Sequence, residues 1–215
     1  MPEPLNVVID LSHHNGNPDL VKAKAAGIIG VIHKATQGFT NVDPMYTTNR
    51  QKALDAGLLW GAFHFGVGGD GAQQADHFLN TVNPDPATLL VLDYEPNPQG
   101  PTMTLVQARD FVSHINAVLQ RFPGFYSGNL IKEQLSNVQL PDPILSQCFL
   151  GIAQYPPSPI PGPTSIPSTW KIWTLWQYTD GSHGPEPRSV DGIGFCDRDK
   201  FNGSLNNLRK LWGVA

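Results

Sequence analysis

LLVLDYEP, residues 89–96, is an apolar run that ends in two carboxylates and is stopped by a proline. Its length and composition are typical of a buried β-strand. Successive side chains of a strand point to opposite faces, so Asp93 and Glu95 are predicted to share one face. At a rise of roughly 3.3 Å per residue, these side chains begin about 6.6 Å apart, close enough for one sugar or one water to touch both. We interpret them as a candidate acid/base pair at a strand end; the alternative is two solvated carboxylates.

Similar apolar runs, each closed by a polar residue, recur along the chain at fairly regular intervals. They are Val7–Asp10, Gly30–Lys34, Trp60–Phe65, Gly124–Ser127, Cys148–Tyr155, Leu175–Tyr178 and Ile193–Asp197. Stretches of helical character separate the early runs: Pro18–Ala26, Pro44–Ala56, Gly71–Val82 and Thr104–Gln120. Alternating strands and helices predict a parallel sheet covered on both faces, and eight strands suggest a closed barrel.

Helix-end signals support two of these helices. Asn17 or Asp43 could cap a first turn that begins with proline, and Gly27 and Gly57 stand where a helix would stop. The pattern breaks later, because Pro156–Trp170 contains six prolines and cannot form an ordinary helix. We therefore predict an α/β fold: a single catalytic (β/α) TIM-like barrel domain over residues 1–215. Its last strands are expected to be irregular, with residues 156–170 as a loop within the domain.

Composition excludes several classes of protein. The chain is 40% hydrophobic and 15% charged, with a net charge of −4 and no run of Lys or Arg. This composition favours a packed globular protein over a nucleic-acid-binding or membrane-surface protein. Neither a membrane span nor a signal peptide is recognisable, and Cys148 and Cys196 are expected to be buried thiols, although one disulfide stays open.

Polar residues gather at the predicted strand ends, where α/β barrels have their active sites. The candidate catalytic residues are Asp10, Asp93, Glu95 and Asp197, and the candidate substrate-binding residues are Lys34, His64, Tyr126, Tyr155, Trp176, Gln177 and Tyr178. Like charges raise one another's pKa, so one carboxyl could stay protonated near neutral pH. Glycoside hydrolysis needs such an acid beside an ionised carboxylate, and aromatic rings suit sugar faces.

Other chemistries have less support. His13 and His14 are adjacent and point to opposite sides of an extended chain, so we predict no metal site and no cofactor. His64 could order the carboxylates by hydrogen bonding or could be a satisfied histidine of the barrel interior. The chain has no Gly-x-Ser-x-Gly motif, and Gly66–Gly71 lacks the spacing of a nucleotide-binding loop.

Six segments together resemble the family 25 glycoside hydrolases, the lysozyme-type muramidases of bacteria, phages and fungi. They are Val8–Gly16, Lys34–Gly38, Gly61–Phe65, Leu92–Glu95, Leu175–Tyr178 and Asp191–Asp197. The resemblance implies hydrolysis of the β-1,4 bond between N-acetylmuramic acid and N-acetylglucosamine in peptidoglycan, on a barrel with irregular last strands. It also implies that Glu95 is the general acid, and that Asp93 orients or stabilises the 2-acetamido group or acts as nucleophile. Asp10, Asp197 and Tyr126 would complete the site, and retention of configuration would be favoured.

Three positions depart from the family pattern. Gln37 replaces a common Glu, Gly151 replaces an aromatic residue, and Asp199 replaces a frequent Asn. The alternatives are therefore a catalytically weak peptidoglycan-binding module and a barrel hydrolase of another amino sugar polymer such as chitin. We expect a monomer whose partner is the peptidoglycan glycan strand. It would act on the cell wall, outside the cell or in the periplasm, after release by lysis or a dedicated secretion route.

Overall fold

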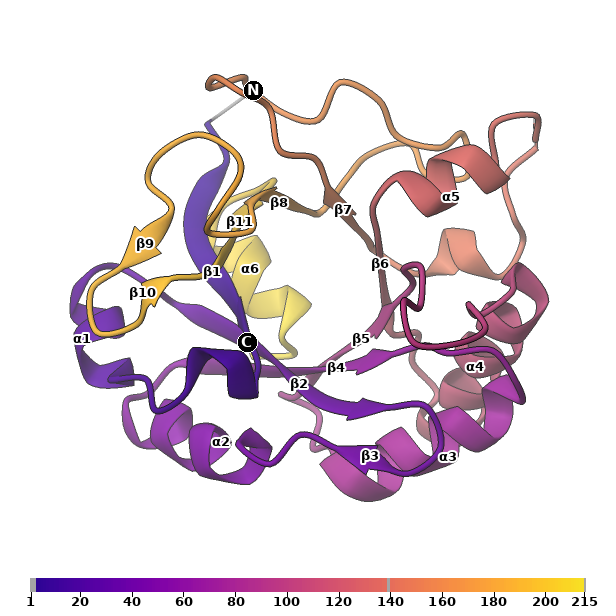
Figure 1. The fold of residues 1–215 in the computed structure, drawn as a ribbon, viewed down its shortest axis with the longest axis horizontal. Coiled ribbons are helices and arrows are strands. Elements are labelled where there is room, and N and C mark those ends of the chain that lie inside the picture. Colours follow the sequence, from indigo (N-terminus) through magenta and orange to yellow (C-terminus); the bar gives the residue numbers. More distant parts are fainter. Residues whose placement is uncertain (1–2, 139, 215) are drawn as a thin grey trace.

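Eight strands close into a barrel in the computed structural model, which describes residues 3–138 and 140–214 (Figure 1). Around the barrel they follow the order β1 (Leu5–Leu11), β11 (Asp197–Phe201), β8 (Leu175–Thr179), β7 (Leu150–Ala153), β6 (Gly124–Ser127), β5 (Leu89–Asp93), β4 (Leu59–Phe65) and β2 (Gly30–Gln37). Pairing of β1 with β2 completes the ring. The α/β barrel predicted from the sequence is confirmed.

One strand runs against the others. β11 pairs antiparallel with both β1 and β8, whereas the remaining barrel pairs are parallel. The sequence-based strand Ile193–Asp197 is misplaced, because the barrel strand begins only at Asp197. Its apolar residue Phe195 lies instead in a small hairpin of β9 (Ser189–Val190) and β10 (Gly194–Phe195) and is 68% exposed. The expected irregularity of the last strands is therefore present.

The four predicted helices are α1 (Leu20–Ala25), α2 (Tyr46–Asp55), α3 (Gly71–Val82) and α4 (Leu105–Leu119), and they lie outside the strands (Figure 1). α5 (Asn129–Gln134) and α6 (Leu205–Leu211) were not predicted. The short strand β3 (Asn41–Val42) pairs with the end of β2. The expected caps differ: Asp19, not Asn17, accepts the N–H of Lys22 at the start of α1, and Asp43 binds the N–H of Met45 just before α2.

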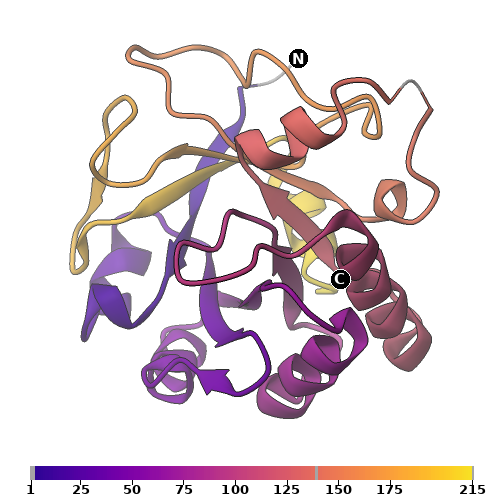
Figure 2. The ribbon, with the colours of Figure 1, turned by 45° about the vertical axis from the view of Figure 1, so that its right-hand side comes forward.

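Helices α3 and α4 pack side by side, as Figure 2 shows at the lower right. Their contact is very close at Gly71, where an added Cβ would lie 2.0 Å from the carbonyl oxygen of Gln107. Only a residue without a side chain allows the two backbones this approach. The glycine therefore sets the spacing of the helix pair behind β4 and β5.

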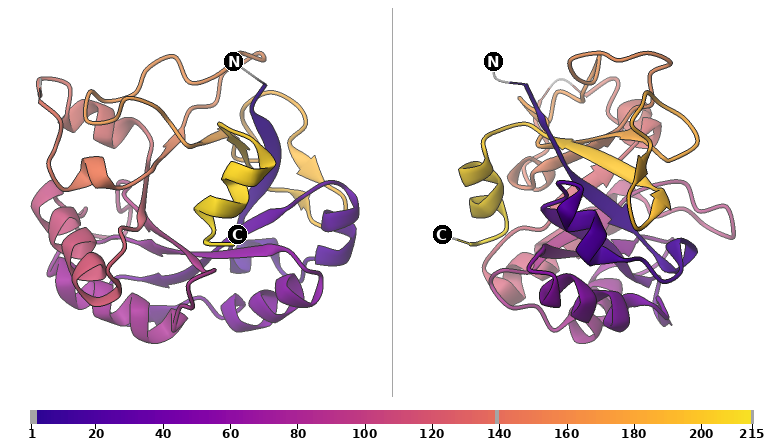
Figure 3. Two further views of the ribbon diagram at one scale, coloured as in Figure 1. Left: turned by 180° about the vertical axis from the view of Figure 1, so that it is seen from behind. Right: turned by 90° about the vertical axis from the view of Figure 1, so that its left-hand side faces the viewer.

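Alternate strand residues face two separate apolar layers. The barrel interior holds Val8, Ile32, Leu89, Val91, Leu175 and Phe201, together with Leu208 and Trp212 from α6 and its end. Helix α6 lies across one end of the barrel, the end that faces the viewer when the molecule is seen from behind (Figure 3, left). The second layer, which includes Leu92, Phe78 and Phe111, packs between the strands and the outer helices. A polar cavity can thus form only at the opposite end of the interior.

Residues 156–170 contain no helix or strand, and the segment arches over the upper edge of the molecule (Figure 2). Cys148 and Cys196 are both buried and free. Burial raises the pKa of each thiol to about 12. In the described ranges no helix has the length and apolar character needed to cross a bilayer.

Candidate active site

A cavity of about 160 Å³ opens at the carboxyl ends of the parallel strands. Its apolar floor comes from the barrel interior, and its polar lining comes from strand ends. The lining residues are Asp10, Ile32, Phe63, Val91, Asp93, Glu95, Tyr126, Phe149, Gly151, Tyr155, Leu175, Gln177, Asp180, Asp197 and Asp199. All four predicted catalytic carboxylates therefore meet in one place, together with the predicted ligands Tyr126, Tyr155 and Gln177.

The carboxylates reach the cavity from two sides of the barrel. Asp93 is the last residue of β5 and Glu95 follows two residues later, so strand alternation carries both to the interior. Asp10 on β1 stands directly opposite Asp197 on β11. The first and last barrel strands thus bring together acids that are 187 residues apart in the chain, and β5 supplies the pair from across the barrel.

The amide of Gln177 connects the tyrosines to the acids. Tyr126 donates its hydroxyl proton to Oε1 of Gln177 at 2.8 Å, and Tyr155 donates to the same oxygen. The amide nitrogen of Gln177 in turn donates to Oδ2 of Asp10 at 3.0 Å. One buried side chain therefore aligns two phenols and one carboxylate around the cavity.

Burial raises the pKa of every acid at the centre of the site. Desolvation raises the pKa of Asp93 well above its usual value, and the nearby charge of Glu95 adds to this effect. Desolvation likewise raises the pKa of Glu95, and it raises the pKa of Asp10 to about 6 and that of Asp197 to about 7. Protonated and ionised carboxyl groups can thus coexist near neutral pH, as acid/base catalysis requires.

The profile of family 25 of the glycosyl hydrolases matches residues 9–186, which are more than three quarters of the chain and include every barrel strand except β11 and the start of β1. The chain belongs to this family. It is 29% identical to lysozyme M1 of Streptomyces globisporus, over 94% of this chain and 70% of that protein. It is 26% identical to the N,O-diacetylmuramidase of Chalaropsis, over 94% and 96% of the two chains.

Solved structures give the same result for the fold. A family GH25 lysozyme from Aspergillus fumigatus superposes with a TM-score of 0.79 at 32% identity, covering 96% of this chain and 98% of that one. The bacterial lysozyme from Streptomyces coelicolor gives a TM-score of 0.79 at 29% identity, with 97% and 98% covered. The family predicted from the sequence, and an enzyme of the glycoside hydrolase class, are therefore confirmed.

Three predicted substrate ligands of this family 25 enzyme are not at the cavity. His64, Trp176 and Tyr178 lie on the outward faces of β4 and β8 and are at most 1% exposed. His64 follows the cavity residue Phe63, and Trp176 and Tyr178 flank the cavity residue Gln177. Because successive side chains of a strand point to opposite faces, these three residues face outward. Our sequence-based assignment of sugar contacts to these three residues is corrected accordingly.

Their polar atoms bind protein groups instead. Trp176 donates its indole N–H to the carbonyl of Gln154 at 2.8 Å, and the Tyr178 hydroxyl donates to the carbonyl of Pro187 at 2.5 Å. Nδ1 of His64 lies 2.8 Å from the Thr36 hydroxyl, and burial lowers the pKa of His64 to about 3. His64 is thus a neutral histidine between the barrel and the outer helices.

Lys34 differs from these three residues because it faces the carboxylates without lining the cavity. Its ammonium donates to Oε1 of Gln37 at 2.6 Å and lies 5.1 Å from the ring centroid of Phe65. Its positive charge lowers the pKa of Asp93 against the dominant effect of burial. Because Gln37 is neutral, it does not cancel the charge of Lys34.

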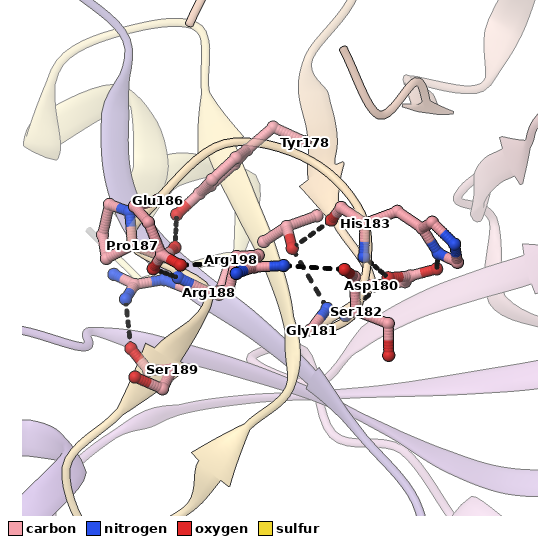
Figure 4. Close-up of polar contacts among 11 residues, drawn as sticks. Tyr178, Asp180, Gly181, Ser182, His183, Glu186, Pro187, Arg188, Ser189 and Arg198 are labelled. Atoms are coloured by element: carbon pink, nitrogen blue, oxygen red, sulfur yellow. Dashed lines mark hydrogen bonds and ion pairs between the residues drawn. The ribbon is translucent and has the colours of Figure 1, made fainter. Parts of the chain in front are cut away.

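Sequence reasoning missed the cavity residue Asp180, which lies in the segment that links β8 to β9. Oδ1 of Asp180 accepts backbone N–H groups of Ser182 at 2.8 Å and of His183 at 2.5 Å, and the His183 ring lies 2.8 Å from Oδ2 (Figure 4). Burial acts to raise the pKa of Asp180, but these hydrogen bonds outweigh it and lower the value. Its place just after the β8 run was the available signal.

Arg188 braces this segment internally, and Arg198 joins the strand that follows it to the barrel (Figure 4). Arg188 pairs with Glu186 at 2.8 Å and donates to the carbonyl of Ser182 at 2.7 Å. From β11, Arg198 donates to the carbonyl of Ser189 at 2.6 Å. These contacts fix one wall of the cavity.

The histidines near the start of the chain do not form a metal site. His13 and His14 lie in a short 3-10 helix, not in an extended chain as expected, and the centroids of their rings are 3.9 Å apart. Nδ1 of His13 lies 2.7 Å from Oδ2 of Asp43. Within the described ranges, no group of three or more His, Cys, Asp or Glu side chains has the arrangement needed to hold a metal ion.

Proposed function

We propose that this family 25 enzyme is a muramidase that hydrolyses the β-1,4 bond between N-acetylmuramic acid and N-acetylglucosamine in peptidoglycan. The observation that carries the proposal is the meeting of Asp93, Glu95, Asp10 and Asp197 in one cavity, with raised pKa values. Relatives that match nearly the whole chain are named lysozyme and N,O-diacetylmuramidase, which supports this activity. They do not favour the alternative of a binding module without turnover.

Glu95 is the proposed general acid. Its side chain is longer than that of Asp93 and more accessible from the mouth of the cavity, where a glycosidic oxygen would enter. Burial favours its protonated form, and that form can give its proton to the departing sugar oxygen.

Asp93 is the proposed partner that acts as an anion. Burial and the charge of Glu95 raise the pKa of Asp93 well above its usual value, which opposes this role. Protonation of Glu95 removes the second effect, and the positive charge of Lys34 favours ionisation of Asp93. An ionised Asp93 can orient and stabilise the 2-acetamido group as positive charge develops on the sugar. If the acetamido oxygen attacks the anomeric carbon, it does so from the face opposite the departing sugar, which leaves with the proton of Glu95. Water then enters from the face that this sugar has left and displaces the acetamido oxygen, so the configuration is retained.

Asp10 and Asp197 form the opposite wall and complete the proposed electrostatic environment. Tyr126 and Tyr155, aligned by Gln177, are the proposed contacts for the substrate, and Phe149 and Leu175 give the sugar an apolar floor. Gly151 has no side chain, and a Cβ there would lie 3.3 Å from the Tyr126 ring. The face of the Tyr126 ring is therefore less covered than it would be beside an aromatic residue at position 151.

The test is digestion of purified peptidoglycan by the wild type and by Glu95→Gln. Removal of a general acid costs about 10²–10⁴-fold in rate. Wild-type products with N-acetylmuramic acid at the reducing end, found by mass spectrometry and nearly absent for the variant, are the expected result. Asp110→Asn is a matched control, because this exposed carboxylate lies on α4 and away from the lined cavity.

Other outcomes discriminate the alternatives. Intact glycan with tight binding by both proteins would favour a binding module, and release of sugars from chitin but not from peptidoglycan would favour the other hydrolase. Product anomer analysis that shows inversion would reject the retaining mechanism.

We further propose that residues 1–215 act as one catalytic domain and as a monomer on the glycan strand. The family acts on the cell wall, and the proposed routes to it are host lysis or a dedicated secretion system. Size-exclusion chromatography with light scattering tests the monomer, since a stable dimer would elute at twice the mass of 23.5 kDa.

A further inference from the structure

Asp199 is a buried carboxyl group in the cavity with no role in the proposed acid/base chemistry. It is 2% exposed and stands opposite Gln177 of β8 on one side and Val8 of β1 on the other. Asp10 lies two residues along β1 from Val8, so Asp10 and Asp199 face the interior from neighbouring strands. A hydrogen bond between the two carboxyl groups lowers the pKa of Asp10 and raises that of Asp199.

The hydrogen-bond donors around this pair are too few for two anions. Gln177 donates to Oδ2 of Asp10, but Oδ1 of Asp10 and Oδ2 of Asp199 are buried and accept no hydrogen bond. A buried carboxylate oxygen without a donor costs free energy, and two such oxygens on adjacent anions also repel. A single proton held between the two groups removes both penalties.

No cation of β11 compensates for the charge of Asp199. Arg198 points to the other face, where it donates to Ser189 and Asn6, and Lys200 lies over the rings of Trp176 and Tyr178. The charged groups that face Asp199 are Asp10 from β1 and Asp197 from β11. Two weak acids nearby, Tyr178 of β8 and Cys196, have pKa values that burial raises, so they bring no further charge to Asp199.

We propose that Asp199 is a positioning residue that stays protonated in the active enzyme and donates its proton in a hydrogen bond to Asp10. Asp10 is then the anion of the pair, because it also receives the amide hydrogen of Gln177. Asp199 acts on the reaction through Asp10, whose orientation and ionisation it fixes. Burial and the charges of Asp10 and Asp197 raise the pKa of Asp199 well above its usual value, in agreement with this assignment.

The direct test is a carboxyl ¹³C NMR titration of the wild type labelled at aspartate, with the Asp199 signal assigned by its loss in Asp199→Asn. The proposal requires that this carboxyl is still protonated at pH 6. Ionisation near the ordinary aspartate value of about 4 would overturn it. This experiment needs no turnover, so its failure is distinct from failure of the proposed function, on which the role of Asp10 rests.

Two variants separate donation from packing. Asn keeps a donor toward Asp10 at every pH, whereas Leu has a similar volume and no donor. We expect Asp199→Leu to be at least about tenfold less active on peptidoglycan than Asp199→Asn, with its acidic limb at higher pH, since Asp10 loses a hydrogen bond that favours its anion. Equal activities and equal acidic limbs would overturn the proposal.

Thermal unfolding provides a second readout that does not depend on substrate. A carboxyl with a raised pKa in the folded state makes the protein less stable as pH rises above the unfolded value of about 4. The melting temperature of Asp199→Asn relative to the wild type should therefore increase between pH 4 and pH 7. A constant difference would contradict a protonated Asp199.

Discussion

Replacement of Gln177 by Met removes three hydrogen bonds and almost no volume. The amide of Gln177 is 4% exposed, accepts from Tyr126 and Tyr155, and donates to Asp10. Each bond from a neutral tyrosine contributes about 1 kcal/mol to stability, and the bond to a carboxylate contributes about 2 kcal/mol. The expected loss in the free energy of unfolding is therefore about 4 kcal/mol, which lowers the melting temperature of a protein of this size by roughly 10 °C.

The same substitution changes the pH profile of peptidoglycan hydrolysis. The hydrogen bond from Gln177 lowers the pKa of Asp10, which burial has raised to about 6. Without that bond the pKa of Asp10 rises further, so the anion forms only at higher pH. The acidic limb of the activity profile is therefore expected to move to higher pH in Gln177→Met.

Chemical unfolding at pH 7 and activity between pH 4 and pH 8 measure the two effects. Gln154→Met is the matched control, because Gln154 also follows a barrel strand but its side chain pairs with Thr164 of the exposed loop. The control should lose less than about 1 kcal/mol. If Gln177→Met lost no more stability than this control and kept the acidic limb of the wild type, Gln177 would not align the tyrosines and Asp10 as we infer.

Two further substitutions test features other than the hydrogen bonds of Gln177. Lys34→Met removes the positive charge that lowers the pKa of Asp93, so the acidic limb of hydrolysis should move to higher pH; an unchanged pH profile would show that Lys34 does not act on Asp93. Gly71→Ala places a Cβ 2.0 Å from the carbonyl oxygen of Gln107. We expect the free energy of unfolding, measured by thermal unfolding, to fall by about 3 kcal/mol. Helix propensity alone would give a gain of about 1 kcal/mol, so a stabilised variant would contradict the close packing.

The sequence was sufficient for the parallel part of the barrel and for the central acids. Runs such as Leu89–Asp93 are buried on both faces, so their continuous apolar character marks the strand and its end marks the site. Asp10, Asp93 and Glu95 could be found because they end or follow such runs, whereas Asp197 was found because it follows the apolar residues Ile193–Cys196, which are not a barrel strand. The resemblance to family 25 then gave the order of the motifs.

The closing strand could not be found in the same way. β11 has the sequence Asp-Arg-Asp-Lys-Phe, in which two acids face the cavity and two cations face outward, so it lacks an apolar signal. The apolar run Ile193–Cys196 directly precedes β11 in the chain, and the last strand was assigned to that run instead. Asp199 was accordingly recognised as a departure but not as part of the site.

The sequence also did not show whether a buried side chain points into the barrel or outward. In Leu175–Thr179 all five residues are buried, so burial alone does not tell which of them reach the cavity. Only the register with β11, which sets Gln177 opposite Asp199, shows that Trp176 and Tyr178 face the outer layer. A sequence read without that register assigns sugar contacts to both.

The insertion of β11 between β1 and β8 has a consequence for how the enzyme becomes active during its synthesis. Until the segment Asp197–Phe201 has left the ribosome and docked, the barrel is open, Asp10 has no facing acid, and the amide of Gln177 has no neighbouring strand on that side. Domains form as their contacting segments become available, and contacts between distant segments form late. Unfinished chains should therefore lack hydrolytic activity toward the cell wall, however well the seven barrel strands that precede β11 have folded.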